Sequence, residues 1–147
     1  MDYQLIPLAH EHLGQAAEIE RLCFSDPWSE KMLAEHLANP CSLTLAAVGD
    51  TGRLLGPVGL LGVGPAGNTT TGAARPDCRR QGVAAALLDA LEAQGKEREL
   101  AFLTLEVRQS NAPARALYEK LGYLQAGLRR NYYENPREDA IIMTKTL

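Results

Sequence analysis

The 147-residue chain lacks an excess of positive charge, since 15 lysines and arginines stand against 18 aspartates and glutamates, for a formal net charge of -3. A protein that binds nucleic acid usually presents a broad basic face, so this balance argues against that function and tolerates a cationic substrate better. Long Ser, Gln or Lys tracts, typical of tails and linkers, are also missing. With 46% hydrophobic residues, we expect one domain, residues 1–147, around one core.

Cysteine is scarce, and its spacing excludes a zinc-finger pattern. Cys23, Cys41 and Cys78 stand far apart, without a C-x-x-C pair or a His cluster at ligand spacing. His10 and His12 could chelate a metal, but two imidazoles alone are usually solvated, so we expect reduced thiols and no metal. No basic segment leads into an apolar stretch at the N-terminus, so a secretory signal is not expected and the cytoplasm is the default compartment.

Charged residues are absent between Arg53 and Arg75, a stretch long enough to cross a membrane as a helix. Its many glycines, two prolines and three consecutive threonines would be too costly in a lipid-exposed helix, so we exclude a membrane span. The same stretch contains GVGPAG at Gly62–Gly67, which matches G-x-G-x-x-G. A dinucleotide fingerprint must open a helix, whereas threonines follow here, so we interpret the match as coincidence.

Apolar periodicity and turn residues predict eleven elements in the order β, α, α, β, β, β, α, β, α, β, β. This is a mixed α/β (α+β) pattern without internal repeats. The strand that begins near Leu54 is unusual, because its glycines and prolines weaken a pleated ladder. The other expected elements are Tyr3–Pro7, Leu13–Cys23, a helix capped by Ser29 and ended by Asn39, Leu43–Val48, a strand that includes Thr71–Ala74 and leads into a basic turn, Gln81–Glu97, Phe102–Val107, Asn111–Gly122, Tyr123–Arg130 and Asp139–Thr144.

A basic turn joins the last of the three consecutive strands in this order to the helix expected at Gln81–Glu97. The first turn of a helix exposes unpaired N–H groups and a partial positive charge, so a pyrophosphate can bind there if the side chains are small. Gly82 and Ala84 permit that approach, and Arg79 and Arg80 add charge. An ordinary helix start with solvated arginines would give the same sequence, so the turn alone does not decide between the two.

Three polar residues after this helix could perform chemistry. Glu106 has apolar neighbours on its strand, and burial would raise the pKa of its carboxyl group toward that of a useful base. Glu106 could equally pair with Arg108 or with another arginine. Asn111 could cap the next helix, and Tyr118 could be a packing tyrosine. Only the set of three suggests acid–base catalysis on an amine.

Six segments, in order along the chain, resemble the GNAT acetyltransferases. They are the R-x-x-G-x-A turn at Arg79–Ala84, Leu105–Arg108 with Ser110 and Asn111, Ala116–Glu119, Leu121–Tyr123, Arg129–Tyr133 and Glu138–Met143. Phe24–Ser29 resembles the N-terminal substrate loop of the members that acetylate the N-terminal alanine of ribosomal protein S18. The resemblance covers nearly the whole chain. It implies a single GNAT-like domain with a mostly antiparallel central sheet flanked by helices.

The same resemblance implies acetyl-CoA as co-substrate, no metal, and the N-terminus of ribosomal protein S18 as the acceptor. Glu106 would be the base, directly or through water, and Tyr118 would protonate the departing CoA thiolate. The groups implied to hold the cofactor are Gly72, Ala73 and Ala74, then Arg79, Arg80, Gln81, Gly82, Val83, Ala84 and Ala85 around the pyrophosphate, and Asn111. The residues implied to contact the acceptor are Trp28, Ser29, Tyr132 and Tyr133.

One stretch departs from the family pattern. Thr71–Ala74 stands where the family places bulky aliphatic residues, and the preceding strand is rich in glycine and proline. Small residues there forfeit packing, at up to about 1 kcal/mol per glycine in a strand interior. This departure leaves open a non-catalytic CoA-binding or protein-interaction domain. Acetyl transfer to other N-termini or small amines also stays open, because loops determine the acceptor specificity.

Overall fold

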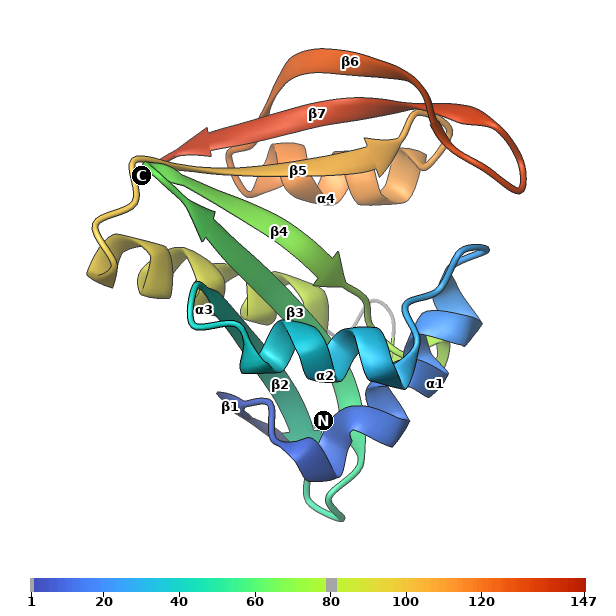
Figure 1. The fold of residues 1–147 in the computed structure, drawn as a ribbon, viewed down its shortest axis with the longest axis vertical. Helices are drawn as coiled ribbons and strands as arrows, with labels where there is room; N and C mark the ends of the chain where they lie inside the picture. The colour runs from blue at the N-terminus through green and yellow to red at the C-terminus, as the bar shows by residue number, and fades with distance from the viewer. Residues whose placement is uncertain (1, 79–81) are drawn as a thin grey trace.

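A computed structural model describes residues 2–78 and 82–147 of the chain (Figure 1). The order of strands and α-helices is the order predicted above. One seven-stranded sheet has the strand order β1-β2-β3-β4-β5-β7-β6. Its strands are β1 (Tyr3–Pro7), β2 (Ser42–Gly49), β3 (Leu54–Val63), β4 (Ala66–Gly72), β5 (Phe102–Arg108), β6 (Leu124–Tyr133) and β7 (Glu138–Thr146).

Helices cover both faces of this sheet (Figure 1). In the described ranges they are α1 (Leu13–Cys23), α2 (Glu30–Ala38), α3 (Val83–Glu97) and α4 (Ala112–Lys120), with 3-10 turns at His10–His12 and Pro76–Cys78. Alternate residues of a strand point to opposite faces. Leu45 and Ala47 accordingly join the core under α3 and α4, whereas Ala46 joins the core under α1 and α2. The predicted stripe of α3, Val83, Leu87, Leu88 and Leu91, is buried throughout.

The sheet divides between β4 and β5. All neighbouring strands pair antiparallel except these two, which pair in parallel and only at Ala66–Asn68 and Phe102–Thr104. On the other side of β4, the register against β3 shifts by one residue at Thr70. Such a bulge bends a strand. Beyond Asn68, β4 therefore diverges from β5, as Figure 1 shows.

The glycine- and proline-rich strand is continuous. β3 forms without interruption between β2 and β4. A side chain at Gly56 would run into the carbonyl oxygen of Ala73, and a Cβ at Gly67 would lie 2.7 Å from Leu60 and 2.8 Å from Leu103. The expectation of forfeited packing is therefore wrong at these two glycines, because neighbouring groups fill the space that a side chain would take.

The segment that matches G-x-G-x-x-G is a turn between two strands. β3 ends at Val63, Gly64 adopts a left-handed φ of 58°, and β4 begins at Ala66. A dinucleotide fingerprint would have to open a helix here, so that interpretation is excluded. In the described part of the chain, no helix is long and apolar enough to cross a membrane.

The histidines and cysteines differ in their surroundings. His12, expected to be solvated, is buried, and its Nδ1 accepts the backbone N–H of Ala9 at 3.0 Å. Among the three cysteines Cys41 is exposed, Cys23 is partly buried and Cys78 is buried. Among the described residues, no three His, Cys, Asp or Glu side chains gather as ligands for a metal.

Candidate active site

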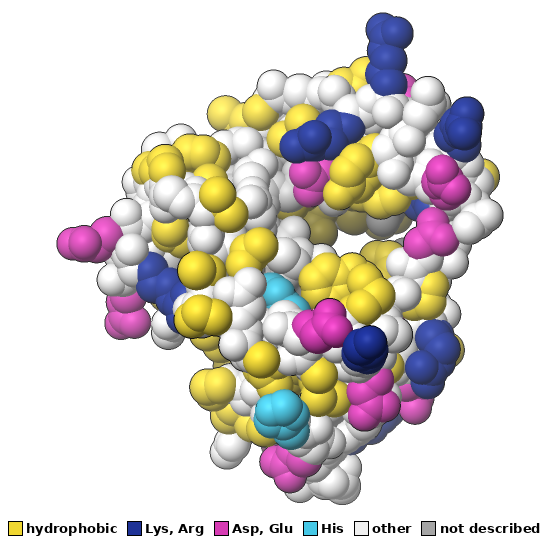
Figure 2. All heavy atoms as spheres, in the orientation of Figure 1, with side chains coloured by type: hydrophobic (Ala, Val, Ile, Leu, Met, Phe, Trp, Pro, Cys, Tyr) yellow, Lys and Arg dark blue, Asp and Glu magenta, His cyan; other side chains and the backbone are white. Residues whose placement is uncertain are grey.

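A cleft of about 1220 Å³ opens where β4 and β5 diverge. Figure 2 shows the opening between the two halves of the molecule. Pockets for small ligands usually measure roughly 300–1,000 Å³, so this cleft has room for a large ligand together with a second substrate. Thirteen of the predicted site residues line it: Trp28, Gly72, Ala73, Ala74, Gly82, Val83, Ala84, Ala85, Glu106, Asn111, Tyr118, Tyr132 and Tyr133.

One wall of the cleft consists of backbone and small side chains from β4 and the residues after it. Past Asn68, no described strand pairs with the edge of β4 that turns toward β5, so backbone groups on that edge can bond to a ligand as another strand would. This wall is also bonded to β3, because Ala73 N–H donates to the carbonyl oxygen of Pro57 at 3.2 Å. An extended amide-bearing chain, such as the pantetheine arm of CoA, fits this wall.

Arg75 anchors this wall instead of contributing charge to the cleft. The side chain is 5% exposed. It donates from Nη1 to Glu18 Oε1 at 2.6 Å and from Nη2 to Gln15 Oε1 at 3.2 Å. Hydrogen bonding to Arg75 holds the pKa of Glu18 below its usual value. The basic segment thus contains a buried arginine that ties the end of β4 to α1, which the sequence did not reveal.

The start of α3 lies at the end of this wall. Gly82 precedes the helix with a φ of 78°, a left-handed conformation that favours glycine. Ala84 and Ala85 then line the cleft with side chains small enough for a ligand to reach the unpaired N–H groups of the first turn. Arg79, Arg80 and Gln81, also predicted to contact the pyrophosphate, lie outside the described residues.

Glu106 projects from β5 into the cleft. Its strand neighbours Leu105 and Val107 are buried on the opposite face, because side chains alternate along a strand. The expected burial of Glu106 is only partial, because β4 has diverged and leaves its carboxylate 24% exposed. Arg129 Nε lies 3.3 Å from Glu106 Oε1. The pairing with an arginine that the sequence left open does exist, but the partner is Arg129 and not Arg108.

Tyr118 and Asn111 come from α4, below β5. Burial raises the pKa of Tyr118, so its hydroxyl group stays protonated at neutral pH and can donate a proton. The ring centre of Tyr118 lies 5.7 Å from that of Tyr123. Asn111 Oδ1 accepts Ala114 N–H at 3.3 Å and caps α4. Both residues have the packing or capping contacts that the sequence allowed, and both also line the cleft.

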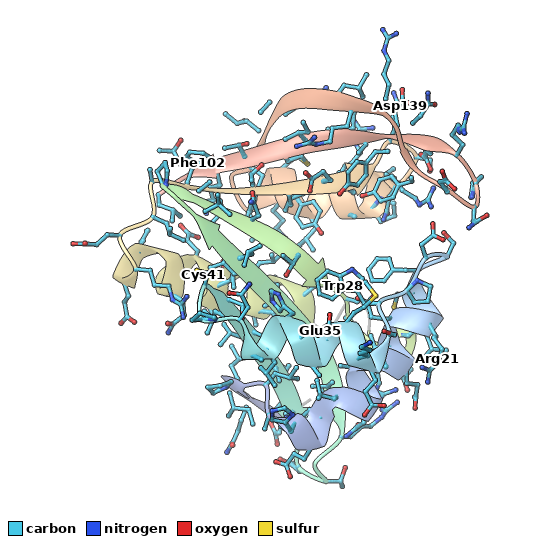
Figure 3. The ribbon with its side chains drawn as sticks, in the orientation of Figure 1. Arg21, Trp28, Glu35, Cys41, Phe102 and Asp139 are labelled. Atoms are coloured by element: carbon cyan, nitrogen blue, oxygen red, sulfur yellow. The ribbon has the colours of Figure 1, made fainter. Side chains whose placement is uncertain are left out.

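The predicted acceptor residues approach the cleft from two elements. Trp28 belongs to the connection between α1 and α2 and is labelled in Figure 3. Tyr132 and Tyr133 end β6, with ring centres 5.0 Å apart. Burial, then the nearby Tyr132 and Glu106, raise the pKa of Tyr133. Ser29 does not line the cleft, because its hydroxyl oxygen caps α2 by accepting Met32 N–H at 3.1 Å.

A carboxylate, a protonated phenol and an unpaired strand edge, gathered in one cleft beside a helix N-terminus, define a group transferase with a large phosphate-bearing donor. The chain belongs to the acetyltransferase (GNAT) family, whose sequence model matches residues 13–123. Enzymes of this family use acetyl-CoA as the acetyl donor, which agrees with the pantetheine-sized wall described above.

The chain is similar to curated enzymes and to a solved structure along nearly its whole length. It is 41% identical to the [ribosomal protein bS18]-alanine N-acetyltransferase of Escherichia coli K12, over 89% of this chain and 88% of that protein. The enzyme of the same name from Salmonella typhimurium LT2 is 38% identical, over 92% of each chain. The crystal structure of the Escherichia coli ribosomal-protein-S18-alanine N-acetyltransferase superimposes with a TM-score of 0.90 at 37% identity, covering 99% of this chain and 94% of that one.

Proposed function

We propose that this protein transfers the acetyl group of acetyl-CoA to the α-amino group of the N-terminal alanine of ribosomal protein bS18, in the cytoplasm. The observation that carries the proposal is that Glu106 and Tyr118 line one cleft, the first as a proton acceptor and the second as a protonated donor. The curated relatives of that name, which match about nine-tenths of the chain, support the choice of acceptor.

The two side chains suffice for the proton transfers. An α-amino group has a pKa of about 8 and is mostly protonated at neutral pH. Glu106, directly or through water, removes one proton, and the free amine attacks the thioester carbonyl carbon. The tetrahedral intermediate collapses with cleavage of the carbon–sulfur bond, and Tyr118 protonates the departing thiolate. The nitrogen then loses a second proton, which returns Tyr118 to its phenol form. The proton on Glu106 passes to solvent.

The Glu106–Arg129 ion pair is compatible with this role. Arg129 is exposed on β6, and its guanidinium carbon also lies 5.9 Å from the ring centre of Tyr132, so its position does not depend on Glu106 alone. An incoming ammonium group carries the same charge as Arg129 and can replace it beside the carboxylate. Because an exposed ion pair contributes roughly 1 kcal/mol or less, the exchange costs little.

A panel of peptides tests the proposal. Purified protein is incubated with acetyl-CoA and peptides of the bS18 N-terminus whose first residue is varied, beside a peptide with a blocked N-terminus. We expect the alanine peptide to have the highest kcat/KM and the blocked peptide to remain unmodified. Acetylation of small amines without acetylation of any peptide would show that the acceptor is a small amine and not a protein N-terminus. Absence of acetyl-CoA binding in calorimetry would refute every acetyltransferase interpretation.

A further inference from the structure

Arg108 connects segments that are distant in the sequence. It ends β5, and its guanidinium group donates four hydrogen bonds. Nη1 donates to Glu138 Oε1 at 3.1 Å and to the carbonyl oxygen of Pro136 at 3.0 Å. Nη2 donates to the carbonyl oxygen of Glu134 at 2.8 Å and to Ser25 Oγ at 3.0 Å. One side chain thus holds both the α1–α2 connection and the β6–β7 connection.

Two further contacts fix the orientation of this guanidinium group. Its carbon lies 4.5 Å from the ring centre of Tyr133, which places the cation over the aromatic face. Glu138, its carboxylate partner, is held in turn, because its other oxygen accepts the backbone N–H of Ser110. These hydrogen bonds keep the pKa of Glu138 below its usual value. The side chains of Arg108 and Glu138 are only 22% and 17% exposed, so this pair is more shielded than an ordinary surface ion pair.

The two connections also meet directly. Asn135 Nδ2 donates to Asp26 Oδ1 at 2.9 Å, and Ser25 Oγ lies 3.5 Å from the carbonyl oxygen of Glu134. Ser25, Asp26 and Tyr133 line the cleft. Residues 24–28 and 134–136, together called here the acceptor gate, therefore close one end of the cleft. The two connections lie on the right of Figure 1. A cleft closed at this end admits a chain terminus more readily than the middle of a polypeptide.

We propose that Arg108 is the positioning residue of the acceptor site: it holds the acceptor gate closed and sets Tyr133 beside Glu106, so that an N-terminal amine is delivered to the base. The inference rests on the proposed function, because it assigns the gate to the acceptor of that reaction. The hydrogen bonds of Arg108 all lead to the gate and to Glu138, and none leads to β4, to residues 73 and 74 or to the start of α3, which together form the donor wall. Removal of Arg108 therefore weakens acceptor binding and leaves donor binding intact.

Three variants and a control separate positioning from general stability. Arg108→Met removes all four hydrogen bonds, Arg108→Lys keeps the charge but not the planar fork, and Ser25→Ala removes one acceptor. The control, Arg21→Met, removes an exposed arginine of α1 that does not line the cleft. We expect the KM for the alanine peptide to rise by roughly tenfold or more in Arg108→Met, because charge-assisted hydrogen bonds are the strong ones. Smaller rises follow for Arg108→Lys and Ser25→Ala, and the control matches the wild type.

Binding of acetyl-CoA and amide hydrogen exchange complete the test. The Kd of acetyl-CoA in Arg108→Met stays within about twofold of wild type, while exchange accelerates in residues 24–28 and 134–136 and not in β1 or β2. An unchanged peptide KM in Arg108→Met, unchanged exchange in the gate, or an equal loss of acetyl-CoA and peptide binding would each overturn the inference. Lack of peptide turnover by the wild type would instead count against the proposed function, and the exchange measurement would still decide whether Arg108 holds the gate.

Discussion

The two walls of the cleft differ in the chemical groups that they offer to a ligand. The wall formed by β4 and the start of α3 offers backbone groups and small side chains, such as those of Gly72 and Ala84. The opposite wall, formed by β5, α4 and β6, offers charged and aromatic side chains, among them Glu106, Tyr118 and Tyr133. This contrast indicates a division of labour, with the donor held by backbone on one wall and the acceptor activated by side chains on the other.

The contrast also explains why substitutions on the two walls should have different consequences. Changes to the donor wall act through the shape of the backbone, so they should alter acetyl-CoA affinity and stability together. Changes to the acceptor wall remove a functional group without disturbing packing, so they should alter turnover while the donor still binds. Each prediction below tests that distinction.

The largest effect is expected at Glu106. Glu106→Gln removes the proton acceptor but keeps the shape of the side chain, so peptide kcat/KM should fall roughly 10²–10⁴-fold, the usual contribution of a general base. Steady-state acetylation measures the loss, and calorimetry should find acetyl-CoA binding retained. Glu119→Gln, on the exposed side of α4, is the matched control. Full turnover in Glu106→Gln would remove this carboxylate from the mechanism.

A loss of about 100-fold in kcat is expected for Tyr118→Phe, because the phenyl ring keeps its packing but cannot protonate the thiolate. Since burial raises the pKa of Tyr118, wild-type activity should show no decline from its ionisation up to pH 9. The control is Tyr123→Phe. Its buried hydroxyl group has no hydrogen-bond partner in the described part of the chain, so its removal should leave kcat unchanged. Equal effects of the two variants would contradict a specific role for Tyr118.

Gly56→Ala tests the donor wall. The added methyl group would meet the carbonyl oxygen of Ala73, so we expect a loss of about 1–3 kcal/mol in the free energy of unfolding, as for other overpacked sites. Urea denaturation measures the loss, and acetyl-CoA affinity should weaken with it because Ala73 lines the cleft. At Gly14 on α1 a Cβ meets nothing within 4 Å. Gly14→Ala should therefore stabilise the protein by about 0.4–1 kcal/mol.

The smallest effect concerns His36, which joins the two sides of the cleft. Its Nε2 lies 3.2 Å from Thr70 Oγ1 on the donor wall, and its ring centre lies 5.6 Å from that of Trp28 in the acceptor gate. Burial lowers the pKa of His36 below 6.5. The unfolded chain therefore binds this proton more readily than the folded protein, and stability falls as the pH drops below the unfolded pKa.

His36→Gln should flatten that fall between pH 7.5 and 5.5, as measured by urea denaturation. The difference in slope is expected to stay below about 1.4 kcal/mol per pH unit, the limit for one proton. His10→Gln, which replaces an exposed histidine, serves as the control. A wild-type stability that does not change over this range, or an equal effect of both substitutions, would show that His36 does not couple protonation to folding.

The order of elements could be predicted because most of them depend on local signals. Leu87 and Leu91 recur at helical spacing, Ser29 and Asn111 are good N-caps, and Gly122, with a φ of 100°, ends the last helix. The direction of Glu106 is local as well, because side chains alternate along a strand. These features are fixed by residues close together in the sequence.

Other features could not be predicted, because they depend on distant segments. The exposure of Glu106 follows from the bulge at Thr70, where β4 leaves β5, and no pattern around Glu106 signals it. Arg75 stands in a basic segment, yet it is buried against Glu18 of α1. Arg108 was considered only as a partner of Glu106, whereas its partners lie on connections that come together only in the folded chain.

The assignment of the donor to one wall and of acceptor activation to the other is tested most directly by finding which nitrogen of the product carries the acetyl group. Purified protein is given acetyl-CoA and a peptide that carries both an N-terminal alanine and an internal lysine, and fragment-ion mass spectrometry identifies the modified nitrogen. We predict one acetyl group, on the α-nitrogen of the alanine, with the lysine unmodified and with the product lost in Glu106→Gln. Acetylation of the lysine in preference to the α-amine, or undiminished product in Glu106→Gln, would contradict this account.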